Sequence, residues 1–269
     1  MSYPVLLGAI VITTANQQIR IKEGANTNQG LIATGTYYLR GDGAAGDFLP
    51  ALVTALQSAN AGSSNTYTAT VSRNIDSNTA HTTITITRAT GADNFQIQWA
   101  NSLTTFDETL LGFTANTADD ALAKTSTQTC AAGWVSNDIL RELEPFGERA
   151  VSVPRKVNGA VVGVTRSSQM TSWALGFAFV HEDRMLKRRA LAVTADTLEG
   201  FMERFGPGAA FEVHESPLSA GTTLSALSSS TRVAVMHWSE DTLSSFRPQR
   251  IGPGVPLYDL DTIAHEQVT

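Results

Sequence analysis

The segment from Tyr67 to Trp99 restricts the possible folds because apolar and uncharged polar residues alternate along three of its stretches. The apolar residues that recur at every second position are Tyr67, Ala69 and Val71, then Ile84 and Ile86, then Phe95, Ile97 and Trp99. A strand with one face on a core has this period of two, whereas a parallel strand buried on both faces is apolar throughout. The segment therefore predicts three strands of an antiparallel sheet.

The opposite face of these strands carries Thr, Ser and Gln with almost no charge. A solvated sheet face often carries Lys and Glu, so an uncharged polar face is typical of a surface that contacts other protein. The residues expected on this assembly surface are Thr83, Thr85, Gln96 and Gln98. This pattern predicts a structural, self-associating protein.

Charge and cysteine content exclude several classes of function. The net charge is −6, which argues against tight binding of a nucleic-acid backbone, because such binding needs clustered Lys and Arg. Cys130 is the single cysteine, so neither an intramolecular disulfide nor a multi-cysteine metal site can form.

The apolar run from Val5 to Ile12 lacks preceding basic residues and favours a strand over a signal peptide. With no apolar run of about 18 to 20 residues, we expect a soluble protein without membrane insertion.

Three regions can be distinguished along the chain. They are residues 1–114, residues 115–145 and residues 146–269. In the first region, predicted strands stand on both sides of a helix that begins after Asp47, a good N-cap, and carries its apolar residues on one face. This order predicts an α+β assembly module in which one helix covers the apolar face of one antiparallel sheet.

The middle region is a predicted connector. Residues 114–129 are rich in Ala, Thr and Asp and contain one large apolar residue, Leu122, so they bury too little surface to become ordered alone. We expect an arm that is flexible in the free subunit and ordered against a neighbour, with Leu122 as its anchor. Ile139 and Leu143 then predict a short helix before Pro145.

The last region predicts a β-rich domain, sandwich-like or barrel-like, with one helix. Asn158-Gly159 between two valine-rich stretches predicts a hairpin, because both central positions of such a turn need positive φ. The helix is expected near residues 198–205, with Thr194 or Asp196 as its N-cap. The fold class predicted for the whole chain is therefore α+β.

One glycine motif invites a nucleotide-binding interpretation. Gly41-Asp-Gly43-Ala-Ala-Gly46 matches G-x-G-x-x-G and lies between a predicted strand and a predicted helix. However, the acidic residue expected about 20 residues later to bind a ribose is absent, and Asp42 and Asp47 place negative charge where a pyrophosphate would lie. We interpret the motif as a turn whose glycines need positive φ and predict no cofactor. The overlapping tripeptide Arg40-Gly41-Asp42 is a still weaker indication of integrin binding.

No constellation of residues predicts catalysis or a metal site. The five histidines are scattered without a pair at ligand spacing. Glu212 and His214 share one strand face and could form an acid/base pair, although polar residues on an outer strand face are common. Cys130 has no nearby His to form a thiolate. We therefore predict that the protein is not an enzyme and has no catalytic or metal-binding residues. If it is an enzyme, a hydrolase is the alternative.

The order of the pieces in residues 9–114 carries a resemblance. The pieces are Ile12-Thr-Thr-Ala-Asn-Gln-Gln-Ile19, Gly35-Thr-Tyr-Tyr38, Leu52-Val-Thr-Ala-Leu56, Tyr67-Thr-Ala-Thr-Val71, Thr83-Ile-Thr-Ile86, Phe95-Gln-Ile-Gln-Trp99 and Leu111-Gly-Phe113-Thr114. Together they resemble a module of virion structural proteins from tailed bacteriophages and other double-stranded DNA viruses. The second half, with Thr197-Leu-Glu-Gly-Phe201, Gly206-Pro-Gly208 and Tyr258-Asp-Leu, is similar in outline to tail-tube and distal-tail components.

This resemblance implies a late virion protein, made in the host cytoplasm, that forms homo-oligomeric rings, often sixfold, with other virion proteins. DNA would pass transiently through the lumen without specific binding, and an acidic protein suits that role because like charges prevent sticking. One alternative is a head-decoration or head-to-tail connector protein. Another is a receptor-binding or carbohydrate-binding tail-tip module that would use Tyr37, Tyr38 and Trp238 as contacts.

Overall fold

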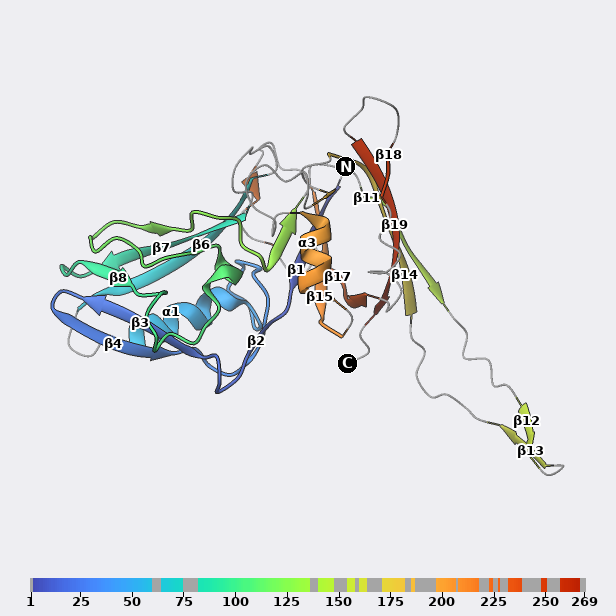
Figure 1. The fold of residues 1–269 in the computed structure, drawn as a ribbon, viewed down its shortest axis with the longest axis horizontal. Coiled ribbons are helices and arrows are strands. Elements are labelled where there is room, and N and C mark those ends of the chain that lie inside the picture. Colours follow the sequence, from blue (N-terminus) through green and yellow to red (C-terminus); the bar gives the residue numbers. More distant parts are fainter. Residues whose placement is uncertain are drawn as a thin grey trace.

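The chain folds into an α+β structure dominated by antiparallel strands, which confirms the predicted fold class (Figure 1). The computed structural model describes residues 2–59, 64–74, 82–135, 140–147, 154–157, 160–163, 171–181, 185–186, 197–206, 208–217, 223–224, 227, 232–238, 248–250 and 257–266. Small sheets packed with α1 form one end of the molecule, and one large sheet forms the other.

The large sheet combines strands from both ends of the described chain. Its strands are β1 (Ser2–Gly8), β10 (Gly133–Val135), β11 (Leu140–Gly147), β14 (Thr171–His181), β15 (Phe211–Pro217), β17 (Arg232–Trp238), β18 (Gln249–Arg250) and β19 (Leu257–Glu266). Their order is β10-β1-β15-β17-β19-β14-β11, with β18 paired to β19. The two end strands β10 and β11 are not paired with each other, so this described sheet is open and is not a barrel.

The position of β1 corrects the predicted domain limits. Leu6 in β1 is opposite Trp134 of β10 on one side and Val213 of β15 on the other. The first strand therefore belongs to the sheet of the C-terminal part, although residues 1–114 were expected to form one module. The physical reason is burial, because Val5, Leu6 and Leu7 are all fully buried and need cover on both faces.

The first part contains three small sheets instead of the single sheet that was predicted. They are β4-β3-β8, β16-β6-β7-β9 and β2-β5. The strands are β2 (Ile10–Ile12), β3 (Gln18–Glu23), β4 (Asn26–Leu31), β5 (Gly35–Tyr37), β6 (Thr66–Asn74), β7 (Thr82–Thr90), β8 (Phe95–Ile97), β9 (Lys124–Thr125) and β16 (Thr223–Leu224). The prediction failed because β8 pairs with β3 and not with β7, and because the polar strand β4 shows no apolar alternation.

Helix α1 (Phe48–Ser58) packs against β6 of one sheet and β3 and β4 of another. Asp47 is its N-cap, as predicted, and accepts a hydrogen bond from the Leu49 backbone N–H. Gly30 allows β4 to approach the helix closely, because a Cβ atom there would overlap the carbonyl oxygen of Ala55. The helix therefore fills the gap on one side between the two sheets.

Two local predictions in the second part were wrong. The expected short helix around residues 139–143 is instead strand β11, in which Leu143 is opposite Leu175 of β14. Helix α3 (Leu198–Arg204) is present as predicted, but its N-cap is Thr197, whose hydroxyl accepts a hydrogen bond from the Gly200 N–H at 3.0 Å. Thr194 and Asp196, the expected caps, lie outside the described residues.

The predicted hairpin is present as β12 (Pro154–Val157) and β13 (Ala160–Gly163). Val157 is opposite Ala160, and the turn residues 158–159 lie outside the described residues. These two strands form a sheet of their own and lie apart from the other strands (Figure 1).

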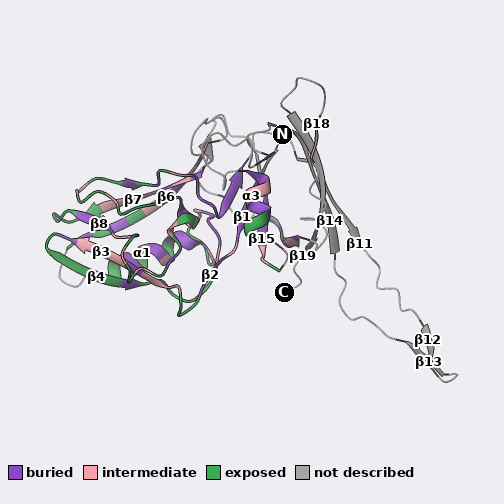
Figure 2. Ribbon diagram, viewed as in Figure 1, coloured by how far each residue is buried: buried purple, intermediate pink, exposed green. Residues whose placement is uncertain are grey.

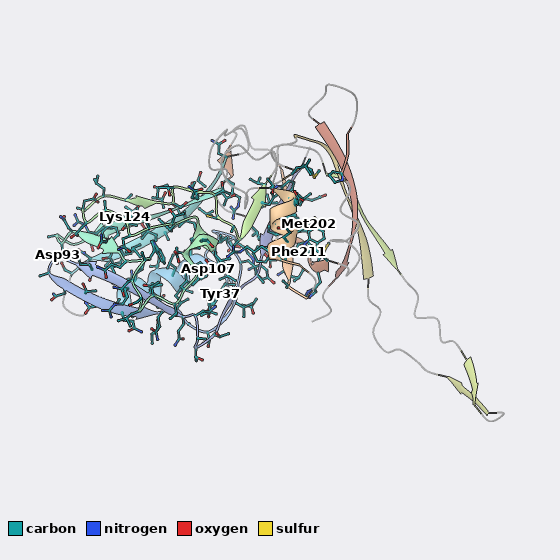
Figure 3. All side chains as sticks on the ribbon, in the orientation of Figure 1. Tyr37, Asp93, Asp107, Lys124, Met202 and Phe211 are labelled. Carbon is teal, nitrogen blue, oxygen red and sulfur yellow. The ribbon has the colours of Figure 1, made fainter. Side chains whose placement is uncertain are left out.

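One hydrophobic core runs through both ends of the molecule (Figure 2). It extends from Leu52 of α1, through Phe106, to Phe201 of α3 and Trp238 of β17. The rings of Phe211 and Trp238 stack with their centroids 4.3 Å apart, and Figure 3 labels Phe211 next to Met202 of α3. Because the core is continuous, the two ends are expected to fold as one unit.

Candidate functional site

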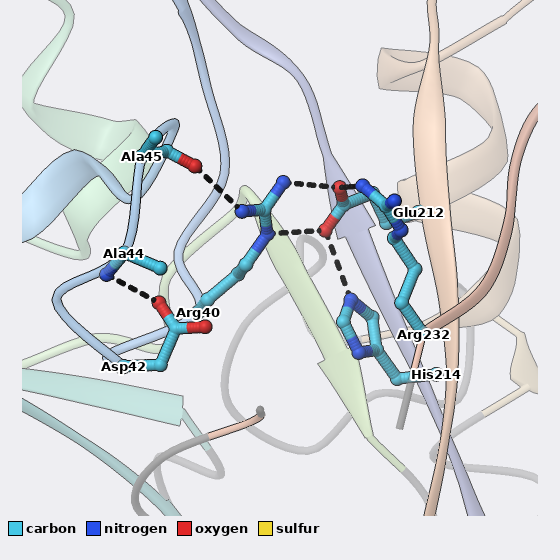
Figure 4. A network of polar contacts seen from close by, with 7 residues as sticks. All are labelled: Arg40, Asp42, Ala44, Ala45, Glu212, His214 and Arg232. Carbon is cyan, nitrogen blue, oxygen red and sulfur yellow. Dashed lines mark hydrogen bonds and ion pairs between the residues drawn. The ribbon is translucent and has the colours of Figure 1, made fainter. Parts of the chain in front are cut away.

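A buried ionic cluster joins the two ends of the molecule (Figure 4). Arg40 follows β5, and its guanidinium donates to both carboxylate oxygens of Glu212 on β15: Nε to Oε2 at 2.8 Å and Nη2 to Oε1 at 2.6 Å. This two-point contact is the strongest geometry for an arginine and a carboxylate. It links residues 172 positions apart in the sequence.

Two further side chains surround the Glu212 carboxylate. His214 Nε2 lies 2.9 Å from Oε2, and Arg232 Nη1 lies 3.5 Å from Oε1. The side chains of Glu212 and His214 are both fully buried, and Arg40 is 8% exposed. The pair considered as a possible acid/base couple is therefore sealed from solvent, and its arrangement serves to hold strands together.

Arg40 also fixes the glycine-rich turn. Its Nη1 donates to the Ala45 carbonyl oxygen at 2.9 Å, and its own carbonyl oxygen accepts from the Leu227 N–H at 3.0 Å. One side chain and its backbone thus hold together the turn, the segment at Leu227 and strand β15. This role was not predicted from the sequence, because Glu212 and Leu227 are distant from Arg40 in the chain.

The cluster perturbs the titration of its carboxylate. Burial alone would raise the pKa of Glu212, but hydrogen bonds from His214 and Arg40, together with the charge of Arg40, lower it to about 2. The pKa of Arg40 is raised, mainly by its hydrogen bond to Glu212. Both shifts favour the charged pair at neutral pH.

We expect this cluster to make the protein sensitive to acid. The pKa of Glu212 falls from 4.5 to about 2 on folding, so its stabilising effect is complete above about pH 4.5 and is lost as the pH falls toward 2. The expected loss is on the order of 3 kcal/mol. Urea unfolding between pH 7 and pH 2 measures it, with the Glu212→Gln variant as reference. An equally steep loss of stability in that variant would show that other groups control the acid response.

The glycine motif forms a turn in which all three glycines have positive φ. The φ angles are 76° at Gly41, 72° at Gly43 and 84° at Gly46. Asp47 accepts from the Gly43 N–H at 2.9 Å while it caps α1, so a carboxylate lies where a phosphate would need to bind. These φ angles and the position of Asp47 agree with the interpretation of the motif as a structural turn. Arg40, the first residue of the Arg-Gly-Asp tripeptide, is engaged with Glu212 and is not presented to a partner.

The four predicted assembly residues are contributed by two sheets. Thr83 and Thr85 lie on β7, whereas Gln96 and Gln98 lie in or next to β8, which belongs to a different sheet. All four are partly buried. The chain itself contacts three of them. The Gln96 side chain donates to the Thr117 carbonyl oxygen at 2.8 Å, the hydroxyl oxygens of Thr85 and Thr125 are 2.9 Å apart, and the Asn101 side chain donates to Gln98 at 3.2 Å.

The predicted flexible arm is instead ordered against the first part of the molecule. Thr117 and Asp120 form backbone hydrogen bonds with β8, and Ser126 forms one with β7. The sequence prediction considered only hydrophobic burial, and these hydrogen bonds to strand edges supply the missing contacts. Leu122 is exposed to 71%, so it remains available for a partner.

The aromatic residues considered for glycan binding are mostly inaccessible. Tyr38 is 7% exposed and Trp238 is 2% exposed, while Tyr37 is partly buried and packs edge-on against Phe48. Sugar binding requires an open aromatic face, so these side chains are core residues and that assignment is corrected.

A second buried polar cluster lies in the first part of the molecule, where the Tyr67 hydroxyl and the Asn65 side-chain amide both donate to the Glu23 carboxylate. In the part of the chain that the structure describes, no group of three or more His, Cys, Asp or Glu side chains is arranged to hold a metal ion. Cys130 is fully buried, and its thiol donates to the Leu111 carbonyl oxygen. No helix in the described ranges is long and apolar enough to cross a membrane. Comparison with protein families, curated proteins and solved structures gives no match.

Proposed function

We propose that this protein is a non-enzymatic virion structural protein that self-assembles into rings, as part of a bacteriophage tail tube or distal tail through which DNA passes. The main support for self-assembly comes from the hairpin β12–β13, whose strands pair with no other described strand. A two-stranded hairpin is at best marginally stable in water. A neighbouring subunit would supply the missing contacts.

One end of the large sheet supports the same proposal. Strand β11 forms this end and pairs only with β14 among the described strands. Open strand edges are templates for pairing with another chain, and repeated contacts between two different surfaces close into a ring. The narrower assignment to a phage tail is supported by the resemblance of residues 9–114, and the net charge of −6 suits passage of DNA without binding.

The ionic cluster favours a scaffold over an enzyme. Its possible acid/base pair, Glu212 and His214, is fully buried, and the Glu212 carboxylate is already bound by Arg40 and Arg232. An acid/base pair in catalysis must come within hydrogen-bonding distance of a substrate. The cluster instead secures the position of the glycine-rich turn against the large sheet, which is the task of a rigid building block.

Electron microscopy and sedimentation of the purified protein test the proposal. We expect rings with a central hole, and we expect a variant in which a short Gly-Ser loop replaces residues 154–163 to remain folded and monomeric. Glu203→Gln on the exposed face of α3 is the matched control and should form rings normally. A wild type that remains monomeric at high concentration would contradict the proposal, and rings formed without the hairpin would show that other surfaces drive assembly.

A further inference from the structure

Residues 114–128, here called the strap, fill the gap between two strands that do not pair with each other. On one side, the Thr117 N–H donates to the Ile97 carbonyl oxygen, and the Phe95 N–H donates to the Asp120 carbonyl oxygen, both at 3.0 Å. These bonds use the free edge of β8. The strap therefore takes the place of a neighbouring strand for the sheet β4-β3-β8.

On the other side, the strap pairs with the edge of β7. Strand β9 lies within the strap and places Lys124 opposite Ile86 and Thr125 opposite Thr85. The Ser126 N–H donates to the Ile84 carbonyl oxygen at 2.9 Å, and the Ile84 N–H donates back to the Ser126 hydroxyl at 3.1 Å. One segment thus satisfies an edge of each of the two sheets.

Little hydrophobic surface holds the strap in place. Only Lys124 and Ser126 are buried within residues 114–128, and the one large apolar residue, Leu122, points into solvent. Lys124, whose position is labelled in Figure 3, forms an ion pair with Asp120, and its Nζ lies 4.6 Å from the centre of the Phe95 ring. Segments held by few apolar contacts open at low free energy. The strap is therefore expected to open more readily than the sheets beneath it.

The strap is attached at both ends to buried positions. The Gln128 N–H donates to the Gly112 carbonyl oxygen at 3.0 Å, and the Cys130 N–H donates to the Thr82 carbonyl oxygen at 2.8 Å. Gly112 has a φ of 79°, which turns the chain sharply into the strap. When the strap opens, the edges of β7 and β8 lose their backbone partners, and buried N–H and C=O groups do not remain unpaired.

We propose that straps exchange between two copies of the chain during assembly, so that the strap of one copy pairs with β7 and β8 of its neighbour. The argument for a second copy is that its strap carries the same Asp120, Lys124 and Ser126 and so remakes every contact that was broken. Exchange of identical segments changes the number of contacts little, which makes it a low-cost route to association. The exposed Leu122 then lies between two subunits. This inference rests on the proposed self-assembly.

Disulfide trapping with two single variants tests the exchange. Thr85→Cys and Thr125→Cys place thiols on directly opposite positions, because Thr85 and Thr125 are paired and their hydroxyls are 2.9 Å apart. When the two variants are mixed, assembled and oxidised, we expect a covalent dimer linked between positions 85 and 125, at least about tenfold above a Thr68→Cys and Thr125→Cys mixture. Thr68 is the control because it lies on β6, where it is opposite Thr87. Oxidation of the wild type, which contains only the buried Cys130, measures the background amount of covalent dimer.

The outcomes separate the exchange from the assembly. Rings without the linked dimer would overturn the exchange and leave the proposed function intact. Linked dimers without rings would support the exchange and contradict ring formation. A wild type that does not associate at all would overturn both. As a second measurement, the double variant Thr85→Cys/Thr125→Cys, oxidised as a monomer, should lose assembly and regain it on reduction, and unchanged assembly in the oxidised form would contradict the exchange.

Discussion

Replacing Glu212 with Ala should lower the free energy of unfolding by about 3 to 5 kcal/mol. The change leaves the buried guanidinium of Arg40 without its carboxylate, and an unpaired buried charge is far more costly than the loss of a surface ion pair. Chemical denaturation at neutral pH measures the effect. The paired substitution Arg40→Met with Glu212→Leu should recover much of the loss, because it removes both charges together.

A surface ion pair provides the control for this prediction. Lys22 and Asp119 form an ion pair in which both side chains are about one-third exposed. Removing it with Asp119→Ala should change stability by less than about 1 kcal/mol. If Glu212→Ala is no more destabilising than Asp119→Ala, the cluster does not hold the two ends together, and its role in the site is wrong.

Substituting Gly112 with Ala should destabilise the protein by about 2 to 4 kcal/mol. Gly112 has a φ of 79°, and a Cβ atom there would overlap the backbone carbonyl oxygen of Gln128, which cannot move aside like a flexible side chain. The new methyl group would also push apart the two chain segments where the strap begins and ends. Thermal or urea unfolding gives the stability, and hydrogen exchange of strap amides should become faster.

Gly43 is the matched reference for Gly112. Its φ of 72° is nearly the same, but no heavy atom lies within 4 Å of a Cβ atom built there. Gly43→Ala should therefore cost only about 1 kcal/mol for the backbone conformation. Equal losses in the two variants would mean that the close approach of Gly112 and Gln128 contributes nothing. Saturable binding of NAD or ATP to the wild type would contradict the turn interpretation of the glycine motif.

Local patterns predicted local elements well. Asp47 and the apolar face that follows it located α1, and the alternation from Tyr67 to Trp99 located β6, β7 and β8, because each signal lies within one element. Patterns of this kind carry no information on which strand pairs with which. The single predicted sheet failed for this reason, and the predicted helix near Leu143 failed because pairing with β14 determined its conformation.

The candidate site was beyond sequence reasoning for a different reason. Glu212 and His214 were recognised as a pair on one strand face, but nothing near them in the sequence indicated that Arg40 would cover them. The strap was predicted to be flexible because its amino-acid composition indicates how little apolar surface it can bury. Composition does not indicate whether the backbone forms hydrogen bonds with strand edges. In both cases the missing information was a contact between distant parts of the chain.

The place of β1 in the large sheet has a consequence for biosynthesis. β1 ends at Gly8, and its long partner β15 begins at Phe211, so the partner emerges from the ribosome only after about 200 further residues. At typical elongation rates this delay is about 10 to 40 s. During that time the small sheets around α1 can form, while the apolar residues Val5, Leu6 and Leu7 lack their contacts with β15. Nascent chains are therefore expected to depend on chaperones at this stage.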